Sequence, residues 1–199
     1  MPRQNKVLMS EARKSLQGRW GIAVAISAIF MAISIGASSI PGAGWIASLI
    51  ISGPLIVGLN KIFLEISRGR QVELDILFDG FSIFSTSLIS YLLILLYVIL
   101  WTLLLIVPGI IAMISYSMTY FIISEQVNIK PADALRKSKM MMQGNKMQFF
   151  LLCCRFIGWF IVGILSAGIG FLWIIPYFMT SMAHFYDDVK QKEQIQTTN

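Results

Sequence analysis

The sequence predicts an all-α polytopic membrane protein with six transmembrane helices in three hairpins and short interfacial amphipathic helices. Hydrophobic residues make up 56% of the 199 residues and charged residues 13%, whereas a soluble domain carries about 25% charged residues. The apolar residues gather in six runs, each near the length that an α-helix needs to cross a bilayer. Nearly all Lys and Arg residues fall on one side of the membrane that these runs define.

Each predicted span is a long apolar run. The six runs cover residues 20–38, 45–63, 84–106, 109–124, 148–165 and 169–185. The links 39–44, 107–108 and 166–168 are too short to cross a helix bundle, so the two helices that each link joins are expected to be neighbours. Three hairpins follow from this pairing.

The distribution of positive charge predicts the orientation. Fifteen of the sixteen Lys and Arg residues lie in the N-terminal arm, after the second span, after the fourth span or in the tail, while the three short links carry no charge. Short loops rich in Lys and Arg stay in the cytoplasm. We therefore expect a multi-pass protein of the bacterial cytoplasmic membrane with both termini cytoplasmic. Anionic headgroups account for the net charge of +6, and no basic-aromatic module indicates a nucleic-acid partner.

The chain is interpreted as one membrane domain, residues 1–199, containing the same unit three times, at 7–63, 72–124 and 131–186. Each unit has an amphipathic stretch, a Gly, a span, an outer turn and a span with a Pro. The glycines are Gly18, Gly80 and Gly144, and the prolines are Pro54, Pro108 and Pro176. The alternative is that Gly and Pro are simply frequent in membrane helices.

Two cytoplasmic stretches have the periodicity of amphipathic helices. Leu8, Ala12 and Leu16 recur every four residues, and a second stripe opens after Pro131 and ends in a run of methionines. An apolar stripe beside Lys and Arg is typical of a helix that lies at the lipid headgroups. Because Met adapts to irregular shapes, the methionine run is also compatible with a partner-binding surface.

No arrangement of residues predicts catalysis, a metal site or a cofactor. The chain has one histidine, which excludes a multi-His zinc site. It has no Gly-rich phosphate loop and no nucleophile elbow. None of the ten acidic residues lies at membrane depth, where a coupled carrier usually keeps one. The sequence therefore predicts a protein that is not an enzyme.

Arg155 is the one charge in the interior of a predicted span, since Lys61 lies near the end of the second span. Side chains on a helix tilt toward its N-terminus, which is cytoplasmic here, so Arg155 is expected to reach headgroup phosphates or a carboxylate such as Glu125 or Asp187. An anion- or lipid-binding role is the alternative to this structural one. His184 and Asp187 lie together where the last span meets the cytoplasm, as a solvated helix end or a pH-sensitive contact.

A polar patch in the fourth span supplies the remaining candidates. Tyr116 and Ser117 lie among Ser and Thr residues in an otherwise apolar run. Such a patch either forms hydrogen bonds between helices or lines a water-filled path.

Several strings resemble one family. They are residues 105–111 (LIVPGII), 116–118 (YSM), 156–159 (FIGW), 168–173 (GIGFLW), 176–177 (PY), 185–186 (FY), 18–20 (GRW) and 77–81 (LFDGF). They resemble the bacterial membrane protein family called domain of unknown function 975, which is similar in plan to the membrane region of some glycerophosphodiester phosphodiesterases. The resemblance implies the topology and no particular activity.

The function expected from these observations is contact with membrane lipids, through anionic headgroups at the cytoplasmic face, with another membrane protein, or with a second copy. The alternative is a component for transport of lipid or a small molecule, with Arg155 and the fourth-span patch lining its path. A membrane enzyme using Asp79 or Asp187 ranks third.

Overall fold

The computed structural model describes the backbone of residues 4–198 and the side chains of residues 4–194. The elements in chain order are α1 (Asn5–Leu16), α2 (Trp20–Ser38), α3 (Gly44–Ser67), the 3-10 helix η1 (Leu74–Phe78), α4 (Asp79–Ser82), α5 (Phe84–Leu104), α6 (Ile106–Tyr116), α7 (Thr119–Glu125), α8 (Pro131–Met141), α9 (Lys146–Leu165) and α10 (Phe171–Thr198). Every element in the described range is helical, which confirms the all-α prediction.

Five stretches in the described range are long and apolar enough to cross a membrane. They are Trp20–Ser38, Gly44–Ser67, Phe84–Leu104, Ile106–Glu125 and Lys146–Leu165. All but the first two residues of the sixth predicted span, 169–185, lie in α10, whose apolar part soon passes into a charged segment. Six spans in three hairpins therefore stay a prediction.

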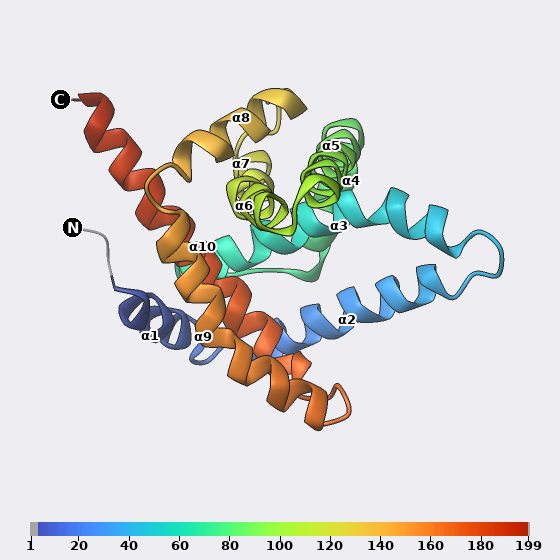
Figure 1. The fold of residues 1–199 in the computed structure, drawn as a ribbon. Helices are drawn as coiled ribbons and strands as arrows, with labels where there is room; N and C mark the ends of the chain where they lie inside the picture. Colours follow the sequence, from blue (N-terminus) through green and yellow to red (C-terminus); the bar gives the residue numbers. More distant parts are fainter. Residues whose placement is uncertain (1–3, 199) are drawn as a thin grey trace.

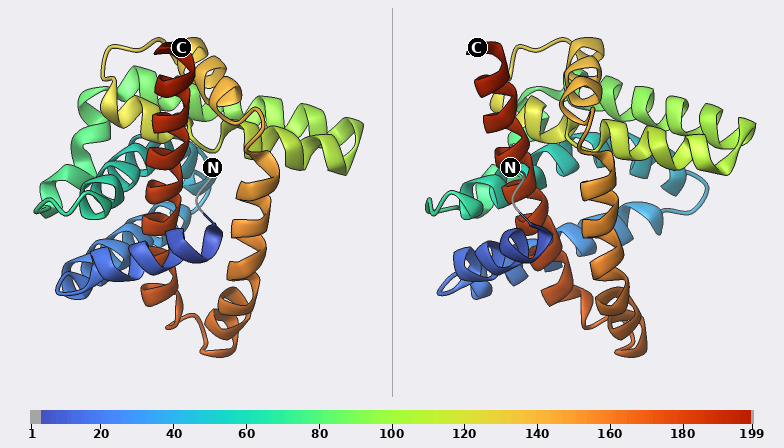
Figure 2. Two further views of the ribbon diagram at one scale, coloured as in Figure 1. Left: turned by 90° about the vertical axis from the view of Figure 1, so that its left-hand side faces the viewer. Right: turned by 60° about the vertical axis from the view of Figure 1, so that its left-hand side comes forward.

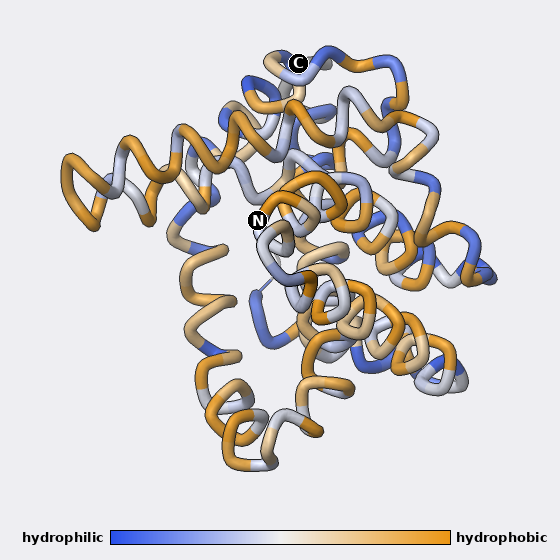
Figure 3. The backbone as a smooth tube through the Cα atoms, turned by 90° about the vertical axis from the view of Figure 1, so that its right-hand side faces the viewer, coloured by the Kyte–Doolittle hydropathy of each residue, from blue (hydrophilic) through white to orange (hydrophobic). Residues whose placement is uncertain are grey.

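Three pairs of consecutive helices, α2–α3, α5–α6 and α9–α10, point away from a common centre in different directions (Figures 1 and 2). Hydrophobic residues cover most of the outer ends of these pairs, and hydrophilic residues gather mainly where the helices converge (Figure 3). Large apolar side chains near the outer ends are exposed, with Leu103 85% and Leu165 81% accessible. The surface of the pairs thus suits an apolar surrounding rather than water.

The apolar stripes of the two amphipathic helices are buried against protein. Leu8, Ala12 and Leu16 are fully buried in α1, which packs on α10 and α3. The stripe of α8 is buried against α5, α6 and α7. The prediction of helices with these faces was right, but the expectation that the stripes meet lipid was wrong, because the convergent ends of the membrane helices cover them. Their basic faces remain outward.

The turn between the third and fourth predicted spans lies earlier than predicted. Leu105 alone is extended, and Pro108 lies in the first turn of α6, where its missing N–H costs no hydrogen bond. A Cβ on Gly109 would collide with Thr102 of α5. Gly109 therefore belongs to close packing between α5 and α6 and not to the turn.

The fourth predicted span is two helices rather than one. α6 ends at Tyr116, and α7 begins at Thr119 after a short turn. The hydroxyl of Ser138 in α8 donates to the carbonyl of Ser115 at 2.8 Å and accepts the N–H of Met118 at 3.2 Å. A side chain that inserts into the backbone ladder is a known cause of such a break.

Candidate functional site

Two helix ends meet the middle of a third helix in a cluster of charged side chains. Arg68 follows the last residue of α3, Glu125 ends α7, and Asp187 lies in α10. The Arg68 guanidinium is 2.6 Å from Glu125 Oε1 and 2.6 Å from Asp187 Oδ1, and its Nε donates to Asp187 Oδ2 at 3.1 Å. We call Arg68, Glu125, Asp187, Tyr186 and Lys190 the ionic junction.

The second oxygen of Glu125 completes the ionic junction. It accepts a hydrogen bond from Tyr186 Oη at 2.6 Å and contacts Lys190 Nζ at 2.5 Å. The hydrogen bond to Asp187 is the main cause that raises the pKa of Arg68. Burial, and then the bond to Glu125, raises the pKa of Tyr186. Two cations and two carboxylates balance, so the junction ties three helices together rather than presenting charge to a ligand.

Of the two contacts expected for Arg155, headgroup phosphates or a carboxylate, pairing with Glu125 or Asp187 is not seen among the described residues. Both carboxylates engage Arg68 instead, because the end of α3 brings its guanidinium between α7 and α10. His184 and Asp187 also face different neighbours. His184 is hydrogen-bonded to Ser15 of α1 at 3.0 Å between Oγ and Nε2, and its Nδ1 is 3.9 Å from a carboxylate oxygen of Glu11.

Arg155 lines a groove together with α1. The groove has a volume of about 390 Å³ and is lined by Lys6, Met9, Ser10, Arg13, Arg155 and Tyr177; we call it the cationic groove. Its three cations come from α1 and α9, and all three are exposed. Within residues 4–194, no hydrogen bond or ion pair engages the side chains of Lys6, Arg13 or Arg155.

A second hollow adjoins the cationic groove. It has a volume of about 230 Å³ and is lined by Arg13, Trp20, Trp159, Trp173, Ile174 and Tyr177; we call it the aromatic hollow. Arg13 and Tyr177 line both spaces. The aromatic hollow and the cationic groove are therefore adjacent, with aromatic rings on one side and positively charged side chains on the other.

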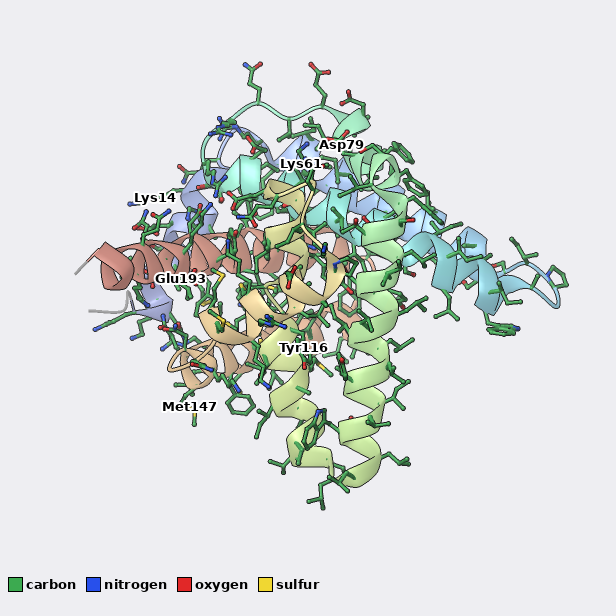
Figure 4. The ribbon with its side chains drawn as sticks, turned by 90° about the horizontal axis from the view of Figure 1, so that it is seen from above. Lys14, Lys61, Asp79, Tyr116, Met147 and Glu193 are labelled. Atoms are coloured by element: carbon green, nitrogen blue, oxygen red, sulfur yellow. The ribbon has the colours of Figure 1, made fainter. Side chains whose placement is uncertain are left out.

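Tyr116 and Ser117 lie elsewhere, at the break between α6 and α7. The ring of Tyr116 stacks on Tyr97 of α5 with centroids 5.8 Å apart, and Ser117 Oγ donates to the carbonyl of Ile114 at 2.8 Å. Tyr116 also lines a hollow of about 190 Å³ with Trp101, Lys139 and Lys146. Figure 4 shows Tyr116 beside α5, well away from the Lys61–Asp79 ion pair at 2.7 Å.

Sequence reasoning missed Arg68 and the groove partners of Arg155. In the sequence Arg68 is one of several cations after the second predicted span, and nothing local distinguishes it from Arg70. Lys6 and Arg13 gave no signal either, because only the fold places α1 beside α9. Among the described residues no group of three or more His, Cys, Asp or Glu residues could hold a metal ion.

The chain was compared with known families, with curated proteins and with solved structures. No curated protein and no solved structure matches it. One family model, described as protein of unknown function (DUF975), matches residues 1–115 and 102–193. Because these two segments together span nearly the whole chain, the protein belongs to the family of proteins of unknown function called DUF975.

Proposed function

We propose that this chain is a non-enzymatic multi-pass protein of the bacterial cytoplasmic membrane that acts through contacts with lipid or with another membrane protein. It has six spans in three hairpins, with both termini in the cytoplasm. The similarity in plan to the membrane region of glycerophosphodiester phosphodiesterases is part of this proposal and concerns architecture alone.

The observation that carries the proposal is the separation of charge from apolar surface. The turns 39–43, 105 and 166–170 lie at the outer ends of the helix pairs and carry no charge. Ion pairs such as Arg68–Glu125 and Lys61–Asp79 lie at the opposite ends of these helices. This separation favours apolar helix pairs in hydrocarbon with the basic ends toward the cytoplasm. For all three pairs to cross one bilayer, they must lie more nearly parallel than in Figures 1 and 2.

The first half of α10 supports the sixth span. Its aromatic residues pack on α9, with Phe156 and Tyr177 centroids 5.1 Å apart and Phe160 and Phe171 centroids 6.2 Å apart. Pro176 lies inside the helix, as Pro is tolerated in membrane helices where neighbours satisfy the freed carbonyl. Thr180 Oγ1 donates to the carbonyl of Pro176 at 2.7 Å, within the same turn of the helix.

The packing pattern supports the threefold repeat. The amphipathic element that opens each unit packs on the return helix of the unit before it: η1 and α4 on α3, α8 on α7, and α1 on α10. Gly18 and Gly144 both adopt φ +76° between the amphipathic helix and the span. Gly80 differs, because it lies in a helix against the Pro54 carbonyl. Three such units form a closed cycle.

Topology reporters test the proposal. A cytoplasm-active reporter fused at Asn199 or in the loop 126–130 is expected to be active, and a periplasm-active reporter in the turn 39–43 is expected to be active. Purification in mild detergent then identifies the lipid or protein that stays bound. A periplasmic signal at Asn199, or recovery of the chain as a soluble monomer without detergent, would overturn the proposal.

A transport component is the second candidate, favoured by the interruption of the stretch Ile106–Glu125. Discontinuous helices bind substrates in many transporters, and the buried hydroxyls of Thr119 and Ser90 have no hydrogen-bond partner within the described residues. An uptake defect in a deletion strain that wild type rescues and Thr119→Val does not, although the variant is folded, would favour transport. Equal rescue by both favours the contact function.

A further inference from the structure

The cationic groove lies between α1 and one residue each of α9 and α10, Arg155 and Tyr177. Asn5 of α1 donates to the carbonyl of Gln148 near the start of α9 at 2.9 Å, and Ser15 is bonded to His184 of α10. Arg155 lies seven residues beyond Gln148, and Tyr177 lies seven residues before His184. Two helical turns correspond to about 10 Å. Arg155 and Tyr177 thus form walls about two turns below α1, at one common depth.

The lining of the groove selects an anion. Lys6 and Arg13 come from α1, Arg155 comes from α9, and no acidic side chain lines either the groove or the aromatic hollow. The carboxylates nearby are engaged elsewhere: Glu11 lies beside His184, and Asp187 binds Arg68. Three cations around one hollow attract a group with concentrated negative charge, and guanidinium groups match phosphate oxygens in pairs.

The aromatic hollow shows that the occupant is also apolar. Trp159 is 50% exposed and Trp173 is 51% exposed, and both line the aromatic hollow together with Tyr177. Tryptophan favours the boundary between headgroups and acyl chains, where one side of the ring is apolar and the other is wet. A free phosphate would fill the groove and leave these rings uncovered, whereas an acyl chain covers them.

We propose that the cationic groove and the aromatic hollow together bind one anionic phospholipid. Lys6, Arg13 and Arg155 hold its phosphate, and Trp20, Trp159 and Trp173 contact its acyl chain. This assignment deepens the proposed function and rests on it, since it requires α1 to lie at the cytoplasmic headgroups. It also explains why Arg155 needs no carboxylate partner: the lipid supplies the negative group.

Tryptophan quenching by brominated lipid tests the proposal on the full chain. The chain has five tryptophans, and replacing Trp45 and Trp101 by Phe leaves only those of the aromatic hollow. This protein is reconstituted in phosphatidylcholine vesicles that contain a small fraction of phosphatidylglycerol or phosphatidylcholine with brominated acyl chains. We expect brominated phosphatidylglycerol to quench at a several-fold lower mole fraction.

Matched variants distinguish a specific phospholipid site from general attraction of anionic lipid to basic residues. The triple variant Lys6→Gln, Arg13→Gln, Arg155→Gln should lose the preference, at roughly fivefold for each cation removed. The control Lys14→Gln, Lys130→Gln, Arg136→Gln removes the same charge from exposed positions and should keep the preference; Figure 4 shows Lys14 near the outer edge. If the triple variant does not fold, Arg155→Gln alone should weaken the preference about fivefold.

Equal quenching by the two brominated lipids in the protein with unchanged groove cations would overturn the proposal, and so would an equal loss in the control variant. Topology reporters distinguish this failure from failure of the proposed function. If the reporter places Asn199 in the cytoplasm but the protein shows no lipid preference, only the lipid-site proposal is wrong. If Asn199 is periplasmic, both the lipid site and the proposed function are wrong.

Discussion

At the scale of single residues, Arg68 joins the end of α3 to both α7 and α10 within the ionic junction. It contacts carboxylates from two other helices, and the side chains of Arg68, Glu125 and Asp187 are 23%, 16% and 25% exposed. As the C-cap of α3, Arg68 also meets the negative end of a helix dipole, which is worth roughly 0.5 kcal/mol. Breaking a buried ion pair costs roughly 3 kcal/mol, so the bridging role dominates.

Arg68→Ala is therefore expected to lower the free energy of unfolding by roughly 3 kcal/mol, since two carboxylates lose their shared partner. Arg68→Lys should recover part of this, because an ammonium does not form the two-sided contact of a guanidinium. Denaturant unfolding in mild detergent, followed by circular dichroism, measures both. Arg70→Ala is the matched control: its side chain is 63% exposed, so a loss below about 1 kcal/mol is expected. Equal losses for Arg68→Ala and Arg70→Ala would contradict this role.

Tyr186 makes the junction sensitive to alkali. Burial, followed by the bond to Glu125, raises the pKa of its phenol above the ordinary value of about 10. Its contribution to stability is complete below pH 10 and is lost as the pH rises further, because the unfolded chain then ionises while the folded chain stays protonated. The free energy of unfolding of Tyr186→Phe should fall less steeply above pH 10 than that of wild type. Parallel curves would show that Tyr186 titrates normally.

At the scale of helices, the sequence predicted those elements whose cause is local. The bounds of α2 equal the predicted run, and the stripe of α1 is buried as its four-residue spacing indicates. The break after Tyr116 could not be predicted, because its cause is Ser138, which is 23 residues from the carbonyl that it binds. In the same way Arg155 was identified as the unusual charge, while its neighbours Lys6 and Arg13 depend on where α1 docks.

Close backbone packing between α3 and the second unit offers a test at this scale. A Cβ on Gly80 would collide with the carbonyl and Cα of Pro54, which are backbone atoms that cannot turn aside. Gly80→Ala should therefore lower the free energy of unfolding by about 1–3 kcal/mol. Gly21→Ala in α2, where the added Cβ meets nothing within 4 Å, should be neutral or stabilise by up to about 1 kcal/mol. Similar melting curves for the two variants would show that α3 and α4 are not in close contact.

At the scale of the whole molecule, the proposed cycle of three units closes through contacts between the two ends of the chain. α1 packs on α10, with Ser15 and His184 bonded across 169 residues of sequence. A linear array of three units would leave the first amphipathic helix without a return helix to cover its stripe. Leu8, Ala12 and Leu16 are instead fully buried. Closure of the cycle of three units by α1 and α10 therefore accounts for the burial of the α1 stripe.

Cross-linking tests this closure in the membrane. In a chain with Cys153 and Cys154 replaced by Ala, Ser15→Cys and His184→Cys should be joined rapidly by a short bis-maleimide, because the native side-chain atoms are 3.0 Å apart. Cleavage at a protease site placed in the loop 126–130 then leaves the two halves linked on a denaturing gel. The control pair Ser15→Cys and Ser166→Cys joins α1 to the α9–α10 turn at the far end of these helices, so it should stay unlinked. A Ser15–His184 pair that links no faster than this control would mean that the ring is open, and burial of the α1 stripe would then require another partner.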